Sequence, residues 1–456
     1  MATVNKQVSI FPLLLSNFIG TMGFSIVLPF LVFLVIEFGG NSLVYGILAA
    51  IYPAFQLIGA PLLGRWSDSI GRKKVLLISN GGTFVGWVVF LIALFVPVWN
   101  IYSVNSIILG TFVITLPLII LFLARALDGI TGGNISVANA YLADISTDKS
   151  RSKNFGKMAI SSNLGFIVGP ALAGILGSTV YKEILPVLAA VFISLISLIV
   201  IAFMLKESKV TPSTTATTAT TATTDTATST ATTASLVEIS EKESIRKVFS
   251  CEPKECYKIP NPKNLSFLDV FRLKDISFLL VLYFFIFLGF NIYYTSFPIH
   301  AVSGLKWTVT EMGIFYSVLS GVMILVQGPV LRKALQKFSE EKLVVIGSLI
   351  LGVNFALFMF NSTVLVYVAL VLFALGNGLM WPSFMSILSK RAGTVHQGVI
   401  QGVGSSMGSL ASIIGLILGG LLYNLIGPTT FLISAAVIFM VFVMSFRLLK
   451  VKKLDR

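Results

Sequence analysis

Long apolar runs alternate with short polar segments over almost the whole chain of 456 residues. A helix needs about 20 mostly apolar residues to cross the hydrocarbon core of a bilayer, and the chain supplies such runs repeatedly. The pattern therefore predicts an all-α polytopic membrane protein with twelve transmembrane helices. We place the runs at 9–36, 43–63, 75–96, 112–141, 156–178, 184–205, 276–302, 311–331, 343–360, 363–388, 398–424 and 429–449.

The segment 97–111 (PVWNIYSVNSIILGT), between the third and fourth runs, is partly apolar but interrupted by polar residues. Two interpretations fit this pattern. The segment is either an outer loop with an apolar part at the membrane interface, or an early extension of the fourth run.

The connections between the runs alternate in charge, and every second one is basic. The positive-inside rule places basic loops in the cytosol. Because the even-numbered connections and both tails are basic, we expect both termini in the cytosol, of either a plasma membrane or an organelle membrane. The basic residues of these connections are Arg65, Arg72, Lys73 and Lys74, then Lys149, Arg151 and Lys153, and then Arg332, Lys333, Lys337 and Lys342.

The composition supports the membrane class, since hydrophobic residues make up 55% of the chain and charged residues only 11%. Soluble domains carry about 25% charged residues. A formal net charge of +14 would suggest nucleic acid binding in a soluble protein. Here the basic residues flank the apolar runs, where topology explains them. We therefore expect the lipid bilayer as a partner and no nucleic acid.

The chain contains two cysteines, Cys251 and Cys256, and two histidines, His300 and His396. The cysteines are too few for a disulfide framework, and the stretch CEPKEC offers too few ligands for a zinc site. The histidines fall at opposite predicted membrane faces, so they form no clustered catalytic motif such as HExxH. We expect no metal, no cofactor and no enzyme activity.

A tract of Thr and Ala at 211–235 has almost no charge and no aromatic or large aliphatic residue. Such a segment cannot bury a core, and we expect it to be disordered. The tract divides the chain into an N-terminal six-helix bundle over 1–206, a cytosolic linker over 207–273 and a C-terminal six-helix bundle over 274–456.

The two halves repeat parts of their sequence. The stretch GAPLLGRWSDSIGRKKVLLIS aligns without gaps to QGPVLRKALQKFSEEKLVVIG, which places Pro61 over Pro329. Likewise GFSI, from Gly23, recurs as GFNI, from Gly289. Internal repeats of this kind are typical of secondary transporters, which hold their substrate near the midplane between two bundles. The repeat predicts two pseudo-symmetric bundles.

Glycines recur with charged residues or proline in three motifs of the N-terminal half. The motifs comprise Gly64, Asp68, Gly71, Arg72 and Lys73 between runs 2 and 3, Arg125, Asp128, Gly129, Gly132 and Gly133 in run 4, and Gly156, Gly165, Gly169, Pro170 and Gly174 in run 5. They resemble motifs of the major facilitator superfamily. The first is similar to the superfamily's loop 2–3 signature, and the motif in run 5 resembles that of its drug:proton antiporters, which include tetracycline-efflux pumps. This resemblance covers nearly the whole chain outside the linker and implies a twelve-helix exporter.

The loop motif holds a carboxylate beside its basic cluster. Asp68 can pair with Arg72, or with the amides and partly positive end of a neighbouring helix. Topology alone would explain the basic residues but neither Asp68 nor the paired glycines. We therefore interpret the motif as a latch that holds the cytosolic side shut.

Run 4 contains Arg125 and Asp128, three residues apart and therefore on one helical face. Ionisable groups inside a membrane usually face a protein or water-filled interior, so this pair is a candidate for proton or substrate coupling. Alternatively, Arg125 extends to the outer interface or merely pairs with Asp128. A small or polar stripe continues this face through Gly132, Ser136, Asn139 and Ala143.

The glycines of run 5 permit close backbone approach, and Pro170 removes a backbone donor and bends the helix. Their direct role is therefore helix packing. The first run departs from tetracycline-type pumps, which carry an acidic residue there, because its polar positions are Asn17, Thr21 and Ser25. Coupling by that route is absent, and Asp128 is the acidic residue that we place well inside a span.

Candidate substrate-binding residues are polar or aromatic and lie near the middle of a predicted span. Each is equally suited to contacts between helices. A mostly apolar cavity with scattered hydrogen-bonding groups suits an amphipathic organic solute. The candidates are Asn17, Gln56, Asn163, Asn291, Tyr294, Tyr316, Gln327, Asn377, Trp381 and Gln401.

The expected function is secondary active transport by a monomer, with proton-coupled export of small organic or drug-like molecules by alternating access. The alternatives are a metabolite importer or uniporter with the same fold, and a non-transporting membrane sensor. An ion channel would need a selectivity filter or a charged ring built by oligomerisation, which Arg125 and Asp128 do not provide.

Overall fold

The computed structural model describes residues 10–132, 134–146, 148–207 and 275–454. The Thr/Ala tract and both cysteines lie outside these ranges. The N-terminal half is the described part up to Glu207, and the C-terminal half is the described part from Asp275.

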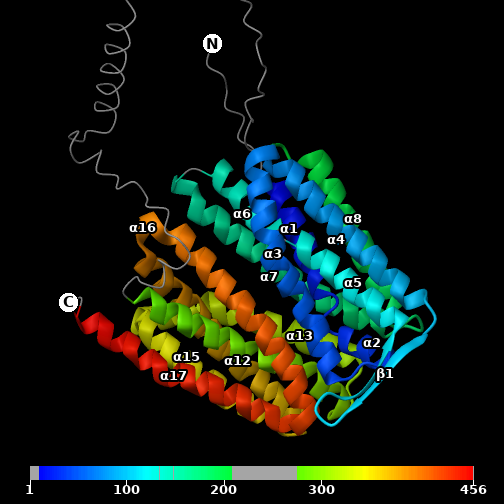
Figure 1. Cartoon of the computed structure of the whole chain (residues 1–456). Coiled ribbons are helices and arrows are strands. Elements are labelled where there is room, and N and C mark those ends of the chain that lie inside the picture. The colour runs from blue at the N-terminus through cyan, green and yellow to red at the C-terminus, as the bar shows by residue number, and fades with distance from the viewer. Residues whose placement is uncertain (1–9, 133, 147, 208–274, 455–456) are drawn as a thin grey trace, which may run out of the picture.

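Helices form the body of both halves, which lie side by side (Figure 1). The N-terminal half contains α1 (Phe11–Ser25), α2 (Leu31–Glu37), α3 (Ser42–Ile70), α4 (Arg72–Phe95), β1 (Asn100–Ser106), β2 (Gly110–Thr115), α5 (Leu116–Thr131), α6 (Asn134–Ile145), α7 (Asp148–Gly177) and α8 (Ile184–Met204). The C-terminal half contains α12 (Ile276–Ser303), α13 (Val309–Leu325), the π-helix η1 (Val326–Val330), α14 (Leu331–Lys337), α15 (Glu340–Leu357), α16 (Thr363–Ile426), the 3-10 helix η2 (Gly427–Thr429) and α17 (Thr430–Leu454).

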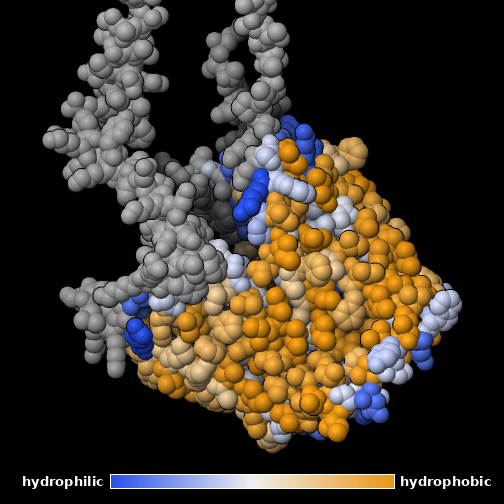
Figure 2. Space-filling model, viewed as in Figure 1, coloured by the Kyte–Doolittle hydropathy of each residue, from blue (hydrophilic) through white to orange (hydrophobic). Residues whose placement is uncertain are grey.

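Eight helical segments of the described chain are long and apolar enough to cross a membrane. Large apolar side chains also cover the exterior, including Phe203, Val443 and Ile160, which are 85%, 66% and 61% exposed. Figure 2 shows this apolar surface in orange over most of the visible face. Because water-soluble proteins rarely expose such continuous apolar area, the exterior faces lipid and the chain is an integral membrane protein.

Several predicted runs are interrupted or joined. The first run is divided between α1 and α2, and the fourth between α5 and α6, where Gly132 ends the first of the two helices. The tenth and eleventh runs form the single helix α16 of 64 residues. A straight helix of that length would measure roughly 96 Å, about three times the thickness of the hydrocarbon core.

The segment after α4 forms an antiparallel β-hairpin, so 97–111 is not a helical extension of the fourth run, and the all-α expectation needs this correction. β-branched and aromatic residues are frequent in both strands and favour an extended backbone. Gly110 adopts the positive φ that the turn requires, and Pro117 helps to start α5 only at Leu116.

The hairpin lies over one end of the molecule and contacts both halves there (Figure 1). Val113 donates a backbone hydrogen bond to Gly39, and Asn41 donates to the carbonyl of Leu109. Gly110 lies against Asn424 of α16. We call this end, with the connections after Glu37, Gly177 and Ser303, the hairpin end. The opposite end, with Arg65 to Lys74, is the basic end.

Helix packing in the N-terminal half is repeated in the C-terminal half. A Cβ on Gly169 of α7 would meet Met22 and Ser25 of α1, and a Cβ on Gly415 of α16 would meet Leu288 and Asn291 of α12. The same offset of 266 residues relates GFSI to GFNI in the sequence. The two halves therefore share a packing plan as well as sequence motifs.

Contacts between the halves follow the same plan. Gly174 of α7 lies against Gly313 of α13, and Gly420 of α16 lies against Gly46 of α3. Gly46 and Gly313 are 267 residues apart, whereas Pro61 and Pro329 are 268 apart. The C-terminal half therefore has one residue more than the N-terminal half between these two positions. The π-helix η1, which includes Pro329 and has a wider turn than an α-helix, accommodates this extra residue.

Candidate functional site

A cavity of about 520 Å³ lies inside the N-terminal half. Its lining is mostly apolar, with polar groups from α1, α3, α4, α5, α6, α7 and α8. Among the described residues that line it, Asp128 alone is formally charged. The polar lining residues are Ser16, Asn17, Thr21, Tyr52, Gln56, Asn80, Thr83, Asp128, Asn139, Ser162, Ser194 and Ser197.

Arg125 and Asp128 form a buried ion pair on α5, with 3.4 Å between Nη1 of Arg125 and Oδ2 of Asp128. Arg125 is 5% exposed and Asp128 is 8% exposed. The Asp128 carboxylate also accepts a hydrogen bond from the side chain of Thr83 on α4. Helical spacing brings both charges to one face, and burial removes them from lipid.

Arg125 has unused hydrogen-bonding capacity. Its guanidinium carbon lies 5.2 Å from the centre of the Tyr52 ring, where the cation and the aromatic face attract each other. Its Nε is buried and has no hydrogen-bond partner among the described residues. A buried donor without a partner is costly, so this group is poised to gain one when its surroundings change.

Gln56 connects α3 to the break between α5 and α6. Its Nε2 donates to the carbonyl of Gly132 at 2.9 Å and lies 3.3 Å from the Tyr52 hydroxyl. Gly129 and Gly132 allow the helices to approach this closely, since a Cβ on either would lie 2.7 Å from Tyr52. The contact between Gln56 and Gly132 fixes the break that follows the Arg125–Asp128 pair.

Asn17 links α1 to α7 beside the cavity. Its Nδ2 donates to Ser162 at 2.7 Å and to the carbonyl of Met158 at 3.2 Å. Asn163, the neighbouring candidate, does not line the cavity, whereas Ser162 does. Adjacent helical residues differ by about 100° in direction, so the two side chains point to different sides of α7.

A second cluster of polar residues lines the cavity between α1, α4 and α8. Ser16 and Ser197 lie 3.0 Å apart, and Ser197 donates to Asn80 at 3.0 Å. None of these three residues was among the sequence candidates. Each falls within a long apolar run, where a single polar residue is the available signal, and such residues commonly bind one another between helices.

The C-terminal candidates Asn291, Tyr294, Gln327, Asn377 and Trp381 do not line this cavity. Asn291 donates to Ser412 at 3.0 Å and to the carbonyl of Phe287, so it joins α12 to α16. Trp381 packs with Tyr283, Phe287 and Phe384 in an aromatic cluster. Both are engaged in helix packing in this conformation.

Some sequence candidates lie outside the description of side chains. These are Gln401, Ser136 and Ala143. Gly132 and Asn139, from the same polar stripe as Ser136, do line the cavity.

The basic end holds a network around Arg72, at the start of α4. Its Nε lies 3.1 Å from Oδ2 of Asp144 on α6, and its Nη1 donates to Ser67 on α3. The side chain of Asp68, the expected partner, is outside the described part of the chain. The network ties three helices together next to the loop motif.

Glu207 supplies a cap that the sequence analysis missed. Its carboxylate accepts hydrogen bonds from the backbone N–H groups of Arg72, at 2.8 Å, and Lys73, at 3.2 Å. The free amides and positive end of α4 favour an anion at this place. The Lys73 ammonium also donates to the carbonyl of Ala202, at the end of α8. The segment that follows α8 is thereby fixed to the loop motif.

The glycines of run 5 pack α7 against two neighbours. A Cβ on Gly165 would lie 2.8 Å from the carbonyl of Phe18 on α1, and Ser25 donates to the Gly165 carbonyl at 3.0 Å. Gly174 instead faces α13 of the other half. The motif therefore serves packing within the half and closure between the halves.

The chain matches the Major Facilitator Superfamily over residues 13–416 and again over 279–456. It is 29% identical to the class E tetracycline resistance protein of Escherichia coli over 412 residues, which cover 89% of this chain and 86% of that protein. It is 27% identical to multidrug resistance protein 2 of Bacillus subtilis (strain 168), with 93% and 91% of the two chains covered.

Solved structures share the fold. The human organic anion transporter MFSD10 (TETRAN) superposes with a TM-score of 0.62 at 18% identity, covering 97% of this chain and 100% of that one. A D-xylose–proton symporter gives 0.69 at 12% identity, covering 95% and 96%. The match over nearly the whole sequence and this shared architecture establish that the chain is a membrane transporter, not an enzyme, and belongs to the Major Facilitator Superfamily.

Proposed function

We propose that this protein is a proton-coupled exporter of small organic or drug-like molecules that works by alternating access. The observation that carries the proposal is the buried Arg125–Asp128 pair, whose carboxylate is the one charged group that the described chain places in the lining of the N-terminal cavity. Curated relatives named for tetracycline resistance and multidrug resistance, which align over most of the chain, support export.

We further propose twelve membrane spans in two six-helix bundles, over 1–206 and 274–456, joined by a cytosolic linker over 207–273. The eight segments of sufficient length include Gly402–Leu449, whose 48 residues exceed a single crossing. α1 adds a shorter apolar helix, and the remaining two crossings would be α15 and the fourth run, which is divided between α5 and α6. Both termini would lie in the cytosol, and a monomer would suffice because each bundle completes the other.

Coupling follows from competition for Arg125. While Asp128 is charged, it holds the Arg125 guanidinium at 3.4 Å. Protonation of Asp128 removes that attraction and frees a guanidinium that already has one unused donor. Arg125 then binds a neighbouring acceptor, and the packing of α5 against α3 changes with it. A substrate that binds beside Asp128 opposes this repacking of α5 against α3. Proton binding and substrate binding then oppose each other, as exchange requires.

The lining indicates the chemistry of the substrate. Apolar side chains such as Phe24, Phe166 and Trp87 would cover a hydrophobic skeleton, while Asn17 and Gln56 offer hydrogen bonds. A volume of about 520 Å³ accommodates a drug-sized molecule. Amphipathic organic molecules therefore fit better than inorganic ions.

The test is uptake of labelled organic solutes into sealed vesicles with and without an imposed pH gradient. Asp128→Asn should retain solute binding and downhill exchange but lose accumulation driven by the gradient. Asp275→Asn, at the start of α12 and away from the cavity, is the matched control and should behave as the native chain. Accumulation by Asp128→Asn in response to the gradient would refute this coupling site.

A further inference from the structure

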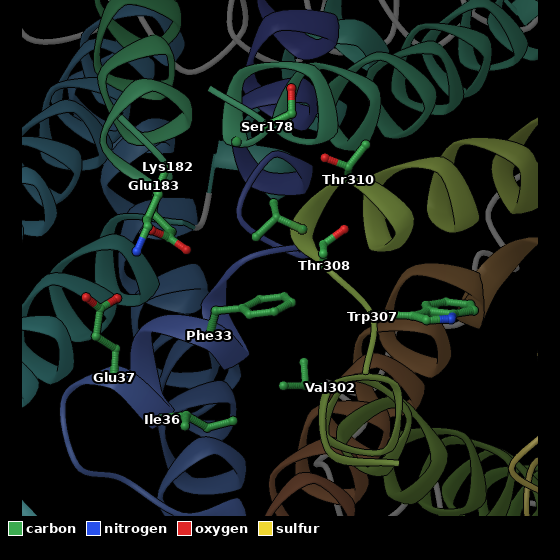
Figure 3. A pocket seen from close by; sticks show the side chains of 12 residues that line it. Phe33, Ile36, Glu37, Ser178, Lys182, Glu183, Val302, Trp307, Thr308 and Thr310 are labelled. Atoms are coloured by element: carbon green, nitrogen blue, oxygen red, sulfur yellow. The ribbon is translucent and has the colours of Figure 1, made fainter. Parts of the chain in front are cut away.

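A second cavity, of about 600 Å³, lies between the two halves at the hairpin end. Glu37 of α2 and the Lys182–Glu183 connection before α8 form one wall, together with Phe33. Val302 and Thr308 of the C-terminal half lie across from them (Figure 3). The charged residues that line the cavity therefore belong to one half, and the described lining residues of the other half are neutral.

Glu183 is an unusual residue for this position because it is a carboxylate only 9% exposed. Among the described residues, its carboxylate hydrogen-bonds only to its own backbone N–H. Buried carboxylates normally have several such partners or an ion pair. Figure 3 shows the Glu183 side chain on the same side of the cavity as the Glu37 carboxylate.

We propose that Glu183 and Glu37 form a second proton-binding site, whose occupancy holds the two halves together at the hairpin end. In the state described by the structure, Glu183 lines a cavity whose opposite wall belongs to the C-terminal half. Separation of the halves would open this cavity and expose the carboxylate to water. A proton therefore binds more tightly when this end is closed, and by linkage the proton favours closure.

The charges around the cavity support tighter proton binding by Glu183 in the closed state. Burial raises the pKa of the Glu183 carboxyl, and the negative charge of Glu37 raises it further, while the hydrogen bond to its own backbone and the charge of Lys182 partly offset both. Across the junction, Glu311 is engaged by the backbone and hydroxyl of Thr308, and Lys306 is exposed and does not line the cavity. His300 hydrogen-bonds Tyr423 inside the C-terminal half and does not line the cavity either.

The direction of the pH effect follows from these contacts. A raised pKa in the closed state means that closure is stabilised at acidic pH, and that this stabilisation is lost as the pH rises through the closed-state pKa. Each tenfold difference in proton affinity between the two states changes the ratio of closed to open molecules by up to about tenfold.

The site gives a role to the external proton in the proposed exchange cycle, on which this interpretation rests. After a substrate leaves at the hairpin end, the transporter must close that end before it can load again. A proton captured by Glu183 would drive this closure, and the pair at Asp128 would carry the coupling itself. The two sites are thus separable by mutation.

The experiment measures how fast a maleimide modifies a cysteine placed in the cavity, at pH values from acidic to mildly alkaline. The full chain with Cys251→Ser and Cys256→Ser receives Val309→Cys, which replaces a cavity residue 8% exposed. Val180→Cys, at a position 90% exposed on the same end, corrects for the pH dependence of the thiol itself. The quantity compared is the ratio of the two modification rates.

We expect this ratio to rise several-fold from acidic to alkaline pH. Glu183→Gln, which resembles the protonated form, should keep the ratio low at all pH values. Glu37→Gln should move the transition to lower pH, because one repelling charge is removed. Glu311→Gln is the matched control, since glutamine preserves the capping interaction with Thr308, and it should leave the curve unchanged.

Asp128→Asn separates this inference from the proposed coupling function. The pH-dependent ratio should persist in Asp128→Asn even though gradient-driven accumulation is lost. A pH dependence that survives Glu183→Gln, or that disappears in Asp128→Asn while Glu183 is intact, would overturn the proposal. Val302→Cys provides a second reporter on the same wall if Val309→Cys does not fold.

Discussion

Gly174 of α7 and Gly313 of α13 meet backbone to backbone across the junction between the two halves. A Cβ on Gly174 would lie 3.2 Å from the Cα of Gly313, and a Cβ on Gly313 would lie 2.6 Å from the Cα of Gly174. Gly46 and Gly420 make the equivalent contact between α3 and α16. Closure of the hairpin end therefore depends on two pairs of glycines related by the internal repeat.

The first prediction follows from these contacts. Gly313→Val should lower transport by about tenfold or more, because a bias of only ~1.4 kcal/mol against the closed state changes its population tenfold. Folding should be little affected, since the halves can separate to relieve the clash. Gel filtration and solute flux measure the two effects.

The control for this prediction is Gly321→Val, on the same helix α13, where a Cβ would meet nothing within 4 Å. It should transport normally. Equal loss of transport in Gly313→Val and Gly321→Val would show that glycine is needed for the helix itself and not for the junction.

The second prediction concerns the cap at the basic end. Glu207→Gln removes the anion that accepts hydrogen bonds from the first amides of α4, and we expect a loss of about 0.5–2 kcal/mol in stability. The ion pair between Arg72 and Asp144 should keep the helices together. Thermal unfolding in detergent measures the change, and Glu341→Gln, in the first turn of α15, is the comparison. An unchanged unfolding temperature would contradict the capping role.

The periodicity of apolar residues was sufficient to predict the membrane class and the position of most helices, since lipid imposes the same length on each span. It did not predict the break between α5 and α6 or the fusion of two runs in α16. The hairpin was missed because Ile101, Val104 and Ile114 were counted as apolar residues without regard to their preference for extended backbone.

Parts of the candidate site could be predicted where an ionisable or isolated polar residue interrupts an apolar run. Arg125 and Asp128 were identified because ionisable residues are rare inside membranes, whereas Tyr52 and Thr83 carry no such signal. Asn17 and Gln56 were selected as isolated polar residues and line the cavity, but Asn291 was selected on the same ground and bridges two helices. Spacing along the chain does not distinguish these cases, because the orientation of each helix is set by its neighbours.

The third prediction concerns the tract 211–235, which lies outside the described residues. If the tract only joins two bundles, deletion of about half of it should leave expression and transport near normal, because a shorter flexible linker still spans the gap. Western blotting and flux assays measure the outcome. Loss of the folded protein would show that the tract has a structural role.

The fourth prediction isolates the buried pair itself. Arg125→Gln leaves the Asp128 carboxylate buried without its charged partner, and breaking such a pair costs about 3–5 kcal/mol. Asp128→Asn should cost less, because Arg125 keeps its contact with the face of Tyr52. The double variant removes both charges and should therefore be more stable than Arg125→Gln alone, although it cannot couple transport to a proton gradient. Thermal unfolding of the three variants in detergent tests this order. Strictly additive losses in the double variant would mean that the two charges do not interact, and the 3.4 Å pair would then have no energetic role in coupling.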